Sequence, residues 1–184
     1  METWEWIVLA IVAGAAVLLL LGLVSVWTKR RRRSHLQERF GPEYHRAVSS
    51  SGRRDGERRL SEVEREHEEL DIRALSAAAR ARYLEEWRQA EVRFVSDPTD
   101  AVRAAERVVE RVLEERGYPA DADTEEQATH VAVDYPDVAE RYRHGHAMLE
   151  KVDGDQSTEN LRKAMLDFRV VLDELVSGRA RTAA

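Results

Sequence analysis

Cysteine is absent from this chain of 184 residues. Its absence excludes disulfide bonds, thiol nucleophiles and cysteine-ligated metals, and it suits a reducing compartment. Glycine-rich phosphate loops, nucleophile elbows and metalloprotease helix motifs are missing as well. No run alternates between apolar and polar residues, as a half-buried strand would. The sequence therefore predicts an all-α protein without a recognisable catalytic motif.

Charged residues are absent from a run of twenty residues, Ile7 to Val26. At 1.5 Å per residue, a helix of this length is about 30 Å long, which matches the hydrocarbon core of a bilayer. An indole ring favours the membrane interface, and three tryptophans flank the run: Trp4, Trp6 and Trp27. The run predicts an N-terminal transmembrane helix that serves as a single membrane anchor.

Five consecutive basic residues follow the apolar run, whereas the only charged residues before it are the acidic Glu2 and Glu5. Lys and Arg beside a span remain in the cytoplasm, so the N-terminus is expected outside and the rest of the chain inside the cell membrane. A cleaved secretory signal fits poorly, because its basic residues would precede a shorter apolar core. The basic residues are also expected to contact anionic lipids of the inner leaflet: Lys29, Arg30, Arg31, Arg32 and Arg33.

The remaining charge is divided unevenly. Residues 29–59 carry eleven Arg and Lys against four Asp and Glu, whereas residues 60–184 carry 18 against 29. An anionic leaflet attracts the first part and repels the second. Nucleic acid is not an expected partner, because binding phosphates needs basic residues on a folded face and the basic part precedes an acidic domain.

Four segments are expected along the chain. They are a transmembrane anchor (1–28), basic juxtamembrane helices with a linker (29–70), an acidic antiparallel helical bundle (71–178) and a flexible tail (179–184). Within the anchor, Ala10 and Gly14 form a small-xxx-small pair, which leaves a homo-oligomer open.

The juxtamembrane part is expected to consist of helices, including a short one from Glu43 to Val48, joined by a linker. Proline lacks a backbone N–H and restricts the residue before it, so Gly41-Pro42 should end the first helix near Phe40. Ser49 to Gly52 has the composition of a linker. From residue 57 to 70 an apolar stripe at Leu60, Val63 and Leu70, completed by His67, covers two heptads, too few for a coiled coil. A solvated helix with a thin apolar seam is expected here.

The bundle is expected to contain five helices, over about 76–96, 97–117, 124–133, 137–152 and 157–177. Ser76, Asp97, Asp123 and Ser157 are the predicted N-caps, and Gly117 is a predicted C-terminal stop. Apolar residues recur every three or four positions, which predicts a shared core: Tyr83, Trp87, Phe94, Val108, Val112, Tyr142, Leu149, Met165, Phe168 and Leu172.

Carboxylates and histidines occur three or four residues apart at Glu64/His67, Glu126/His130 and Glu140/His144. Di-iron bundles use two Glu-x-x-His pairs with two further glutamates, and here Glu64/His67 alone has that spacing. Such pairs are expected by chance in an acidic helical chain, and His144-Gly145-His146 is expected to be a surface pair. We therefore predict no catalytic, cofactor-binding or metal-binding residue, with a metal- or small-molecule-binding bundle as the alternative.

Several short motifs carry a family resemblance: Arg39-Phe40-Gly41-Pro42-Glu43-Tyr44, Arg82-Tyr83 with Trp87, Phe94-Val95 before Asp97-Pro98, Ala101-Val102 and Arg116-Gly117-Tyr118-Pro119. Together they resemble an uncharacterised family of bacterial single-span membrane proteins with a cytosolic helical domain. The resemblance implies no activity, cofactor or site residue. The expected function is that of a membrane-anchored, non-enzymatic protein-interaction or scaffolding module.

Overall fold

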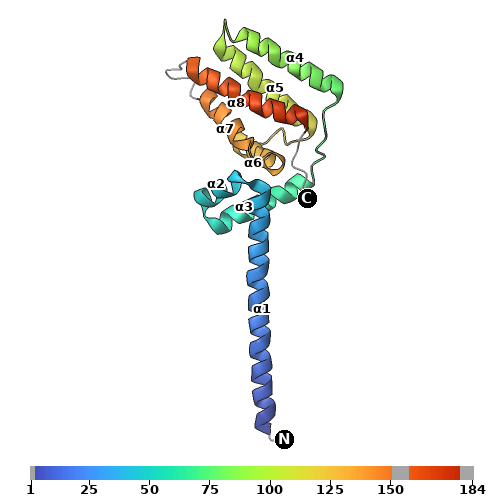
Figure 1. The fold of residues 1–184 in the computed structure, drawn as a ribbon, viewed down its shortest axis with the longest axis vertical. Coiled ribbons are helices and arrows are strands. Elements are labelled where there is room, and N and C mark those ends of the chain that lie inside the picture. Colours follow the sequence, from blue (N-terminus) through green and yellow to red (C-terminus); the bar gives the residue numbers. More distant parts are fainter. Residues whose placement is uncertain (1–2, 151–157, 179–184) are drawn as a thin grey trace.

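A computed structural model describes residues 3–150 and 158–178. Those residues form eight helices and no strand, which confirms the predicted all-α class (Figure 1). For most residues between 3 and 29 the backbone alone is described. The helices are α1 (Thr3–Phe40), α2 (Pro42–Ser51), α3 (Arg53–Glu68), α4 (Ala77–Arg93), α5 (Pro98–Arg116), α6 (Thr124–Asp134), α7 (Ala139–Glu150) and α8 (Thr158–Ser177).

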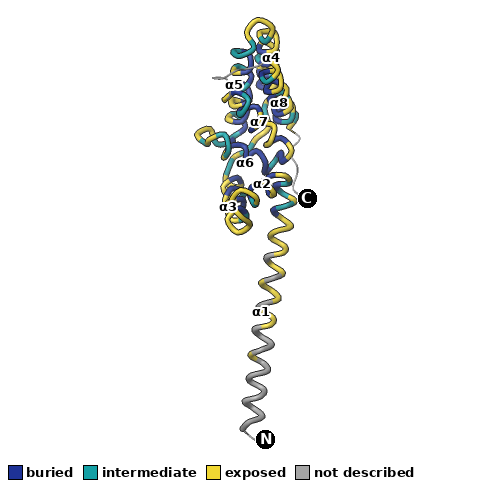
Figure 2. Tube along the Cα trace, turned by 90° about the vertical axis from the view of Figure 1, so that its left-hand side faces the viewer, coloured by how far each residue is buried: buried dark blue, intermediate teal, exposed yellow. Residues whose placement is uncertain are grey.

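The first helix, α1, is continuous over 38 residues and projects from the folded part of the chain (Figures 1 and 2). It ends at Phe40 as predicted, because Gly41 adopts a positive φ of 52° and Pro42 opens α2. Its last turns enter the folded part, where Leu36 and Phe40 are completely buried. Packing therefore fixes the direction in which α1 leaves the folded part.

The predicted membrane span, Ile7 to Val26, falls mostly on side chains outside the described residues. Among the described residues, no helix is both long enough and apolar enough to cross a membrane. The side chains of Trp4 and Trp6 also lie outside the described residues, whereas Trp27 is exposed. The membrane span therefore stays a prediction.

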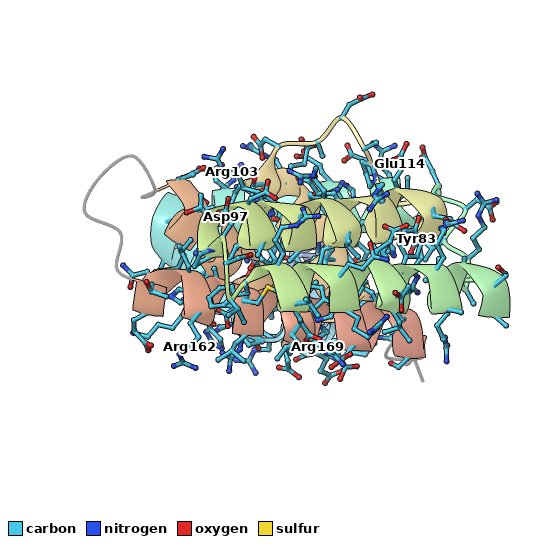
Figure 3. The ribbon with its side chains drawn as sticks, turned by 90° about the horizontal axis from the view of Figure 1, so that it is seen from above. Tyr83, Asp97, Arg103, Glu114, Arg162 and Arg169 are labelled. Atoms are coloured by element: carbon cyan, nitrogen blue, oxygen red, sulfur yellow. The ribbon has the colours of Figure 1, made fainter. Side chains whose placement is uncertain are left out.

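Four helices, α4, α5, α7 and α8, form the larger unit, which we call the bundle (Figures 1 and 3). α5 packs against α4 and α8, and α8 packs against α7. Trp87, Tyr142 and Phe168 are its largest fully buried side chains. All ten predicted core residues are buried except Phe94, which is partly buried. The apolar stripes thus correctly predicted a shared core.

A smaller unit, which we call the basal unit, consists of the end of α1 with α2 and α3, and it packs on α6. The expectation of a solvated α3 was wrong, because its apolar seam is buried. The predicted linker is also helical, since α2 continues to Ser51. The buried apolar residues of this core are Leu36, Phe40, Tyr44, Ala47, Leu60 and Val63, with Ala132, Val133 and Ala139 from α6 and α7.

Glycine explains how two short helices close this core. At Gly56 an added Cβ would lie 2.8 Å from the carbonyl oxygen of Ala47. The missing side chain lets α3 approach α2 directly, so a thin apolar stripe is sufficient to exclude water. In the bundle, Gly145 has the same role, because a Cβ there would lie 2.8 Å from the Phe168 ring.

The short helix α6 lies between the two units. Ala128 and Val131 belong to the bundle core, whereas Ala132 and Val133 belong to the basal core. Every residue from Gln127 to Val133 is buried. One helix therefore contributes to both cores and connects them.

Helix ends follow the predicted capping residues. The side chains of Ser76, Asp97 and Asp123 accept backbone N–H bonds of 3.0, 3.0 and 2.8 Å from the residues three positions on. Gly117 ends α5 with a φ of 99°, where an added Cβ would lie 2.4 Å from the carbonyl oxygen of Asp71. The predicted cap Ser157 and the tail at 179–184 lie outside the described residues.

Candidate functional site

A cleft of about 890 Å³ lies between α1 and α3. Both helices meet at the side of the folded part from which α1 projects (Figures 1 and 2). We call this cleft the arginine cleft. Its lining residues are Arg30, Arg32 and Arg33 from α1, and Arg53, Arg54, Glu57 and Arg58 from α3. Six arginines therefore face one glutamate.

Local structure brings these like charges together. Arg30 and Arg33 are three residues apart and share a face of α1. Gly52, with a φ of 81°, reverses the chain so that α3 runs back along α2 and then meets α1, where Arg32 donates to Ser61. Arg53 and Arg54 then fall in the first turn of α3, where the positive end of the helix dipole makes a cation unfavourable. The arrangement is electrostatically costly without an anion.

Carboxylates of the chain neutralise part of this charge. Glu57 accepts a 2.7 Å hydrogen bond from the Tyr44 hydroxyl, and burial followed by this bond raises the pKa of Tyr44. Arg58 pairs with Asp55 at 3.0 Å. Of the six lining arginines, only Arg58 forms an ion pair with a residue that the structure describes, and Arg32 donates to the Ser61 hydroxyl at 3.2 Å. The other four make no ion pair within the described part of the chain: Arg30, Arg33, Arg53 and Arg54. Their guanidinium groups are available to an anion from outside the chain.

The structure places part of the predicted lipid-contacting set in this cleft. Arg30 to Arg33 are all exposed, and Arg31 lies 5.6 Å from the centre of the Trp27 ring, a cation–π contact. Lys29 lies outside the described side chains. Sequence reasoning missed the second wall, because the arginines of α3 alternate with acids. The sequence feature that could have revealed this wall is the pair Arg53 and Arg54 in the first turn of a helix, where cations are unfavourable.

A second polar region joins the two units. Arg143 of α7 donates to Glu43 of α2 at 2.7 Å and to Glu125 of α6 at 2.7 Å. Arg46 of α2 also reaches Glu125, at 2.9 Å. Burial raises the pKa of Glu125, but the two arginines outweigh this effect and lower it overall. Because Arg143 and Glu43 are both buried, their pairing holds α7 against the basal unit.

Histidines lie at the same junction. His67 of α3 contacts Asp134 of α6 at 3.2 Å, and the Tyr118 hydroxyl donates to Asp134 at 2.5 Å. The rings of His67 and His130 lie 6.2 Å apart, and the Nδ1 atom of each is buried without a hydrogen-bond partner. Burial, followed by the nearby His67, lowers the pKa of His130. A proton on His130 would therefore be costly.

Both longer sequence motifs surround this junction. In Arg39 to Tyr44, Gly41 forms the corner between α1 and α2, and Glu43 binds Arg143. In Arg116 to Pro119, Arg116 donates to the Tyr135 hydroxyl at 2.7 Å and to the Leu175 carbonyl at 2.9 Å. The motif residues therefore have structural roles where helices meet.

Two of the predicted carboxylate–histidine pairs do not form, because their members contact other residues. Glu64 contacts His35 at 2.7 Å, while His67 turns to Asp134. His144 pairs with Asp167 of α8. The surface interpretation of His144-Gly145-His146 was half wrong, because His144 is exposed and His146 is buried.

Two groups in the described part of the chain place one histidine and two glutamates within 4.8 Å of one another: Glu66, Glu126 and His130, and Glu106, Glu110 and His146. In the second, the Nδ1 atom of His146 lies 2.9 Å from Glu106. Burial, followed by Glu106, raises the pKa of Glu110. Sequence reasoning missed this group, because its members come from two helices, α5 and α7.

Comparison with known proteins adds no assignment: no family model, curated protein or solved structure matches the chain. The resemblance to bacterial single-span membrane proteins stays a prediction. The candidate function therefore rests on the geometry of α1, the arginine cleft and the two units.

Proposed function

We propose that the chain is a single-pass protein of the cell membrane, and that its folded part is a non-enzymatic protein-interaction or scaffolding module at the inner leaflet. One observation carries this proposal. α1 runs without a break from an apolar stretch into the buried core of the basal unit. Leu19, Leu23 and Trp27 on this helix are all more than half exposed. Exposed apolar surface of this extent is characteristic of contact with a membrane or a partner.

A continuous helix would hold the folded part at a set distance from the bilayer. Leu36, the first buried side chain among those described in α1, follows Val26 by ten residues, a rise of about 15 Å. A flexible linker of that length would let the folded part rotate freely. The rigid connection favours a module that presents one surface at a constant height, as a scaffold requires.

Charge supports the orientation. The basic residues of α1 and α3 lie nearest the apolar stretch, whereas residues 60–184 carry 18 basic against 29 acidic side chains. An anionic leaflet attracts the basic residues and repels the acidic part. Both effects favour a folded part that stands away from the membrane with its basal unit toward it.

Topology is the first test of this proposal. A reporter fused after Ala184 should be active in the cytoplasm, and the chain should resist carbonate extraction from membranes. Neutral substitutions of Lys29 to Arg33 should produce mixed orientations, because the charge bias is lost. Extraction of the unmodified chain by carbonate would contradict membrane insertion.

Partner binding is tested by photo-crosslinking in native membranes. Val95, 90% exposed just after the end of α4, is a suitable position for the crosslinker. The expected result is a defined adduct that is lost when the neighbouring exposed Val92 is changed to Asp. The same crosslinker at the exposed Arg103 is the control (Figure 3). Adducts that are identical at both positions would contradict a specific surface.

The second candidate function, a metal-binding bundle, is favoured by the group Glu106, Glu110 and His146. Carboxylate and imidazole ligands suit zinc, iron or manganese. Metal analysis of the purified chain separates the two functions. Stoichiometric metal that is lost in Glu110→Gln, but retained in the exposed Glu114→Gln, would favour this candidate over the scaffold.

A further inference from the structure

The arginine cleft has two walls that carry the same charge. The wall on α1 contributes Arg30 and Arg33, and the wall on α3 contributes Arg53 and Arg54. We propose that this cleft binds the headgroup of an anionic lipid that carries two phosphate charges, one for each wall. The proposal rests on the membrane anchor proposed above.

An anionic ligand is favoured by the residual charge. Glu57, the one acidic residue of the lining, accepts a hydrogen bond from Tyr44, and Arg58 is paired with Asp55. Arg30, Arg53 and Arg54 have no carboxylate partner among the described residues. Arginine presents several N–H donors in a plane, which matches two phosphate oxygens at once. A bound phosphate would therefore relieve the repulsion between the walls.

A lipid is favoured over a soluble phosphate by position. Arg30 follows Val26 by four residues, so it lies about 6 Å further along the axis of α1. If residues 7–26 cross the bilayer, this depth is that of the lipid headgroups, which extend about 5–8 Å beyond the hydrocarbon core. The α3 wall belongs to the basal unit, on the side of the folded part that faces the apolar stretch (Figure 2).

A ligand with two negative charges is favoured by the size of the cleft and by the presence of arginines on both of its walls. A volume of about 890 Å³ greatly exceeds that of one phosphate group. A lipid with a single phosphate would neutralise one wall and leave the other unpaired. Two phosphodiesters joined by a glycerol, as in diphosphatidylglycerol, place one charge against each wall.

The test uses the full chain in nanodiscs of neutral lipid doped with diphosphatidylglycerol, or with phosphatidylglycerol at twice the molar amount to match the charge. Native mass spectrometry measures the lipid retained on release. Diphosphatidylglycerol should be retained preferentially. Near an anionic surface each arginine contributes roughly fivefold in binding, so Arg53→Gln with Arg54→Gln should weaken retention roughly 30-fold.

The matched control is Arg80→Gln with Arg103→Gln, two exposed arginines of the bundle. This control should leave retention unchanged. In neutral lipid, Arg53→Gln with Arg54→Gln should melt at the same temperature as the unmodified chain or higher, because it removes repulsion. This melting measurement shows that a loss of lipid is not a loss of fold.

Three results would overturn the proposal. They are equal retention of the two lipids, equal loss in the control variant, and binding of inorganic pyrophosphate in neutral nanodiscs as tightly as the lipid. The last would assign the cleft to a soluble ligand. Carbonate extraction is a separate measurement, so a failure of membrane insertion is distinguished from a failure of lipid selectivity.

Discussion

The bundle and the basal unit bury their residues in different ways. The bundle core is built from long amphipathic helices around Trp87, Tyr142 and Phe168, and none of its buried residues precedes Ala79. The basal core is small and is completed by Ala132, Val133 and Ala139, which come from the other side of residue 70. Arg143 connects the two units through a buried ion pair with Glu43 and a partly exposed one with Glu125. The bundle core thus takes Ala128 and Val131 from α6, whereas the basal core requires residues from both α6 and α7.

The largest expected loss of stability comes from a substitution in the bundle core. Phe168→Ala should destabilise a fragment of residues 33–184 by about 3–5 kcal/mol, because it leaves a cavity beside α7. That is a large part of the roughly 5–15 kcal/mol available to a domain. Urea denaturation measures the change, and the exposed Arg88→Ala should cost little. Equally mild effects of both substitutions would mean that the apolar stripes are not a cooperative core.

The second-largest loss of stability is expected at the ion pair that connects the two units. Arg143→Ala leaves Glu43 buried without its partner, which should cost about 3 kcal/mol. Replacing both residues by apolar side chains, Arg143→Met with Glu43→Leu, should recover much of that loss. A double-mutant cycle by urea denaturation measures the coupling. Additive losses in the double variant would contradict an energetic connection through this pair.

A smaller effect is expected in the basal core. Leu60→Ala should cost about 2 kcal/mol, near the lower end for buried leucine, because the few neighbouring helices can move into the space. Hydrogen exchange should show faster opening of α2 and α3, with α5 and α8 unchanged. Leu166→Ala, on the exposed face of α8, is the control. Equal acceleration in both units would show that they unfold as one.

The smallest expected effect depends on pH. The pKa of His130 is lowered from 6.5, so the unfolded chain binds this proton more readily than the folded chain. Its contribution to stability is complete above pH 6.5 and falls as the pH drops through 6.5 toward the lower folded value. Urea denaturation between pH 8 and pH 5 should show this fall, and His130→Gln should reduce it. Substitution of the exposed His45, His45→Gln, should leave the dependence of stability on pH unchanged. An unchanged dependence in His130→Gln would contradict the assignment of the fall to His130.

Local features were predicted well from the sequence. Ser76, Asp97 and Asp123 cap helices because a side-chain oxygen three residues from a free N–H is a local geometry. Trp87 and Phe168 were placed in a core because helical periodicity puts apolar residues on one face. Both kinds of prediction depend on neighbours within a few residues.

Predictions failed where distant segments meet. The seam of α3 looked too thin to be buried, because the sequence does not reveal that α1, α2 and α6 surround it. The α3 wall of the arginine cleft was missed for the same reason, and so was the group of Glu106, Glu110 and His146. These sites depend on contacts between helices that are far apart in the sequence.

The sequence by itself therefore determined the helical class, the helix ends, the apolar stripes of the bundle and the uncharged run in α1. Each follows from propensity, capping or periodicity along one helix. The tertiary structure decided that the basal unit is folded, that α6 belongs to two cores, and that arginines from α1 and α3 share one cleft. The physical reason is that burial and charge proximity are properties of pairs of helices, and glycines such as Gly56 set how closely such pairs approach.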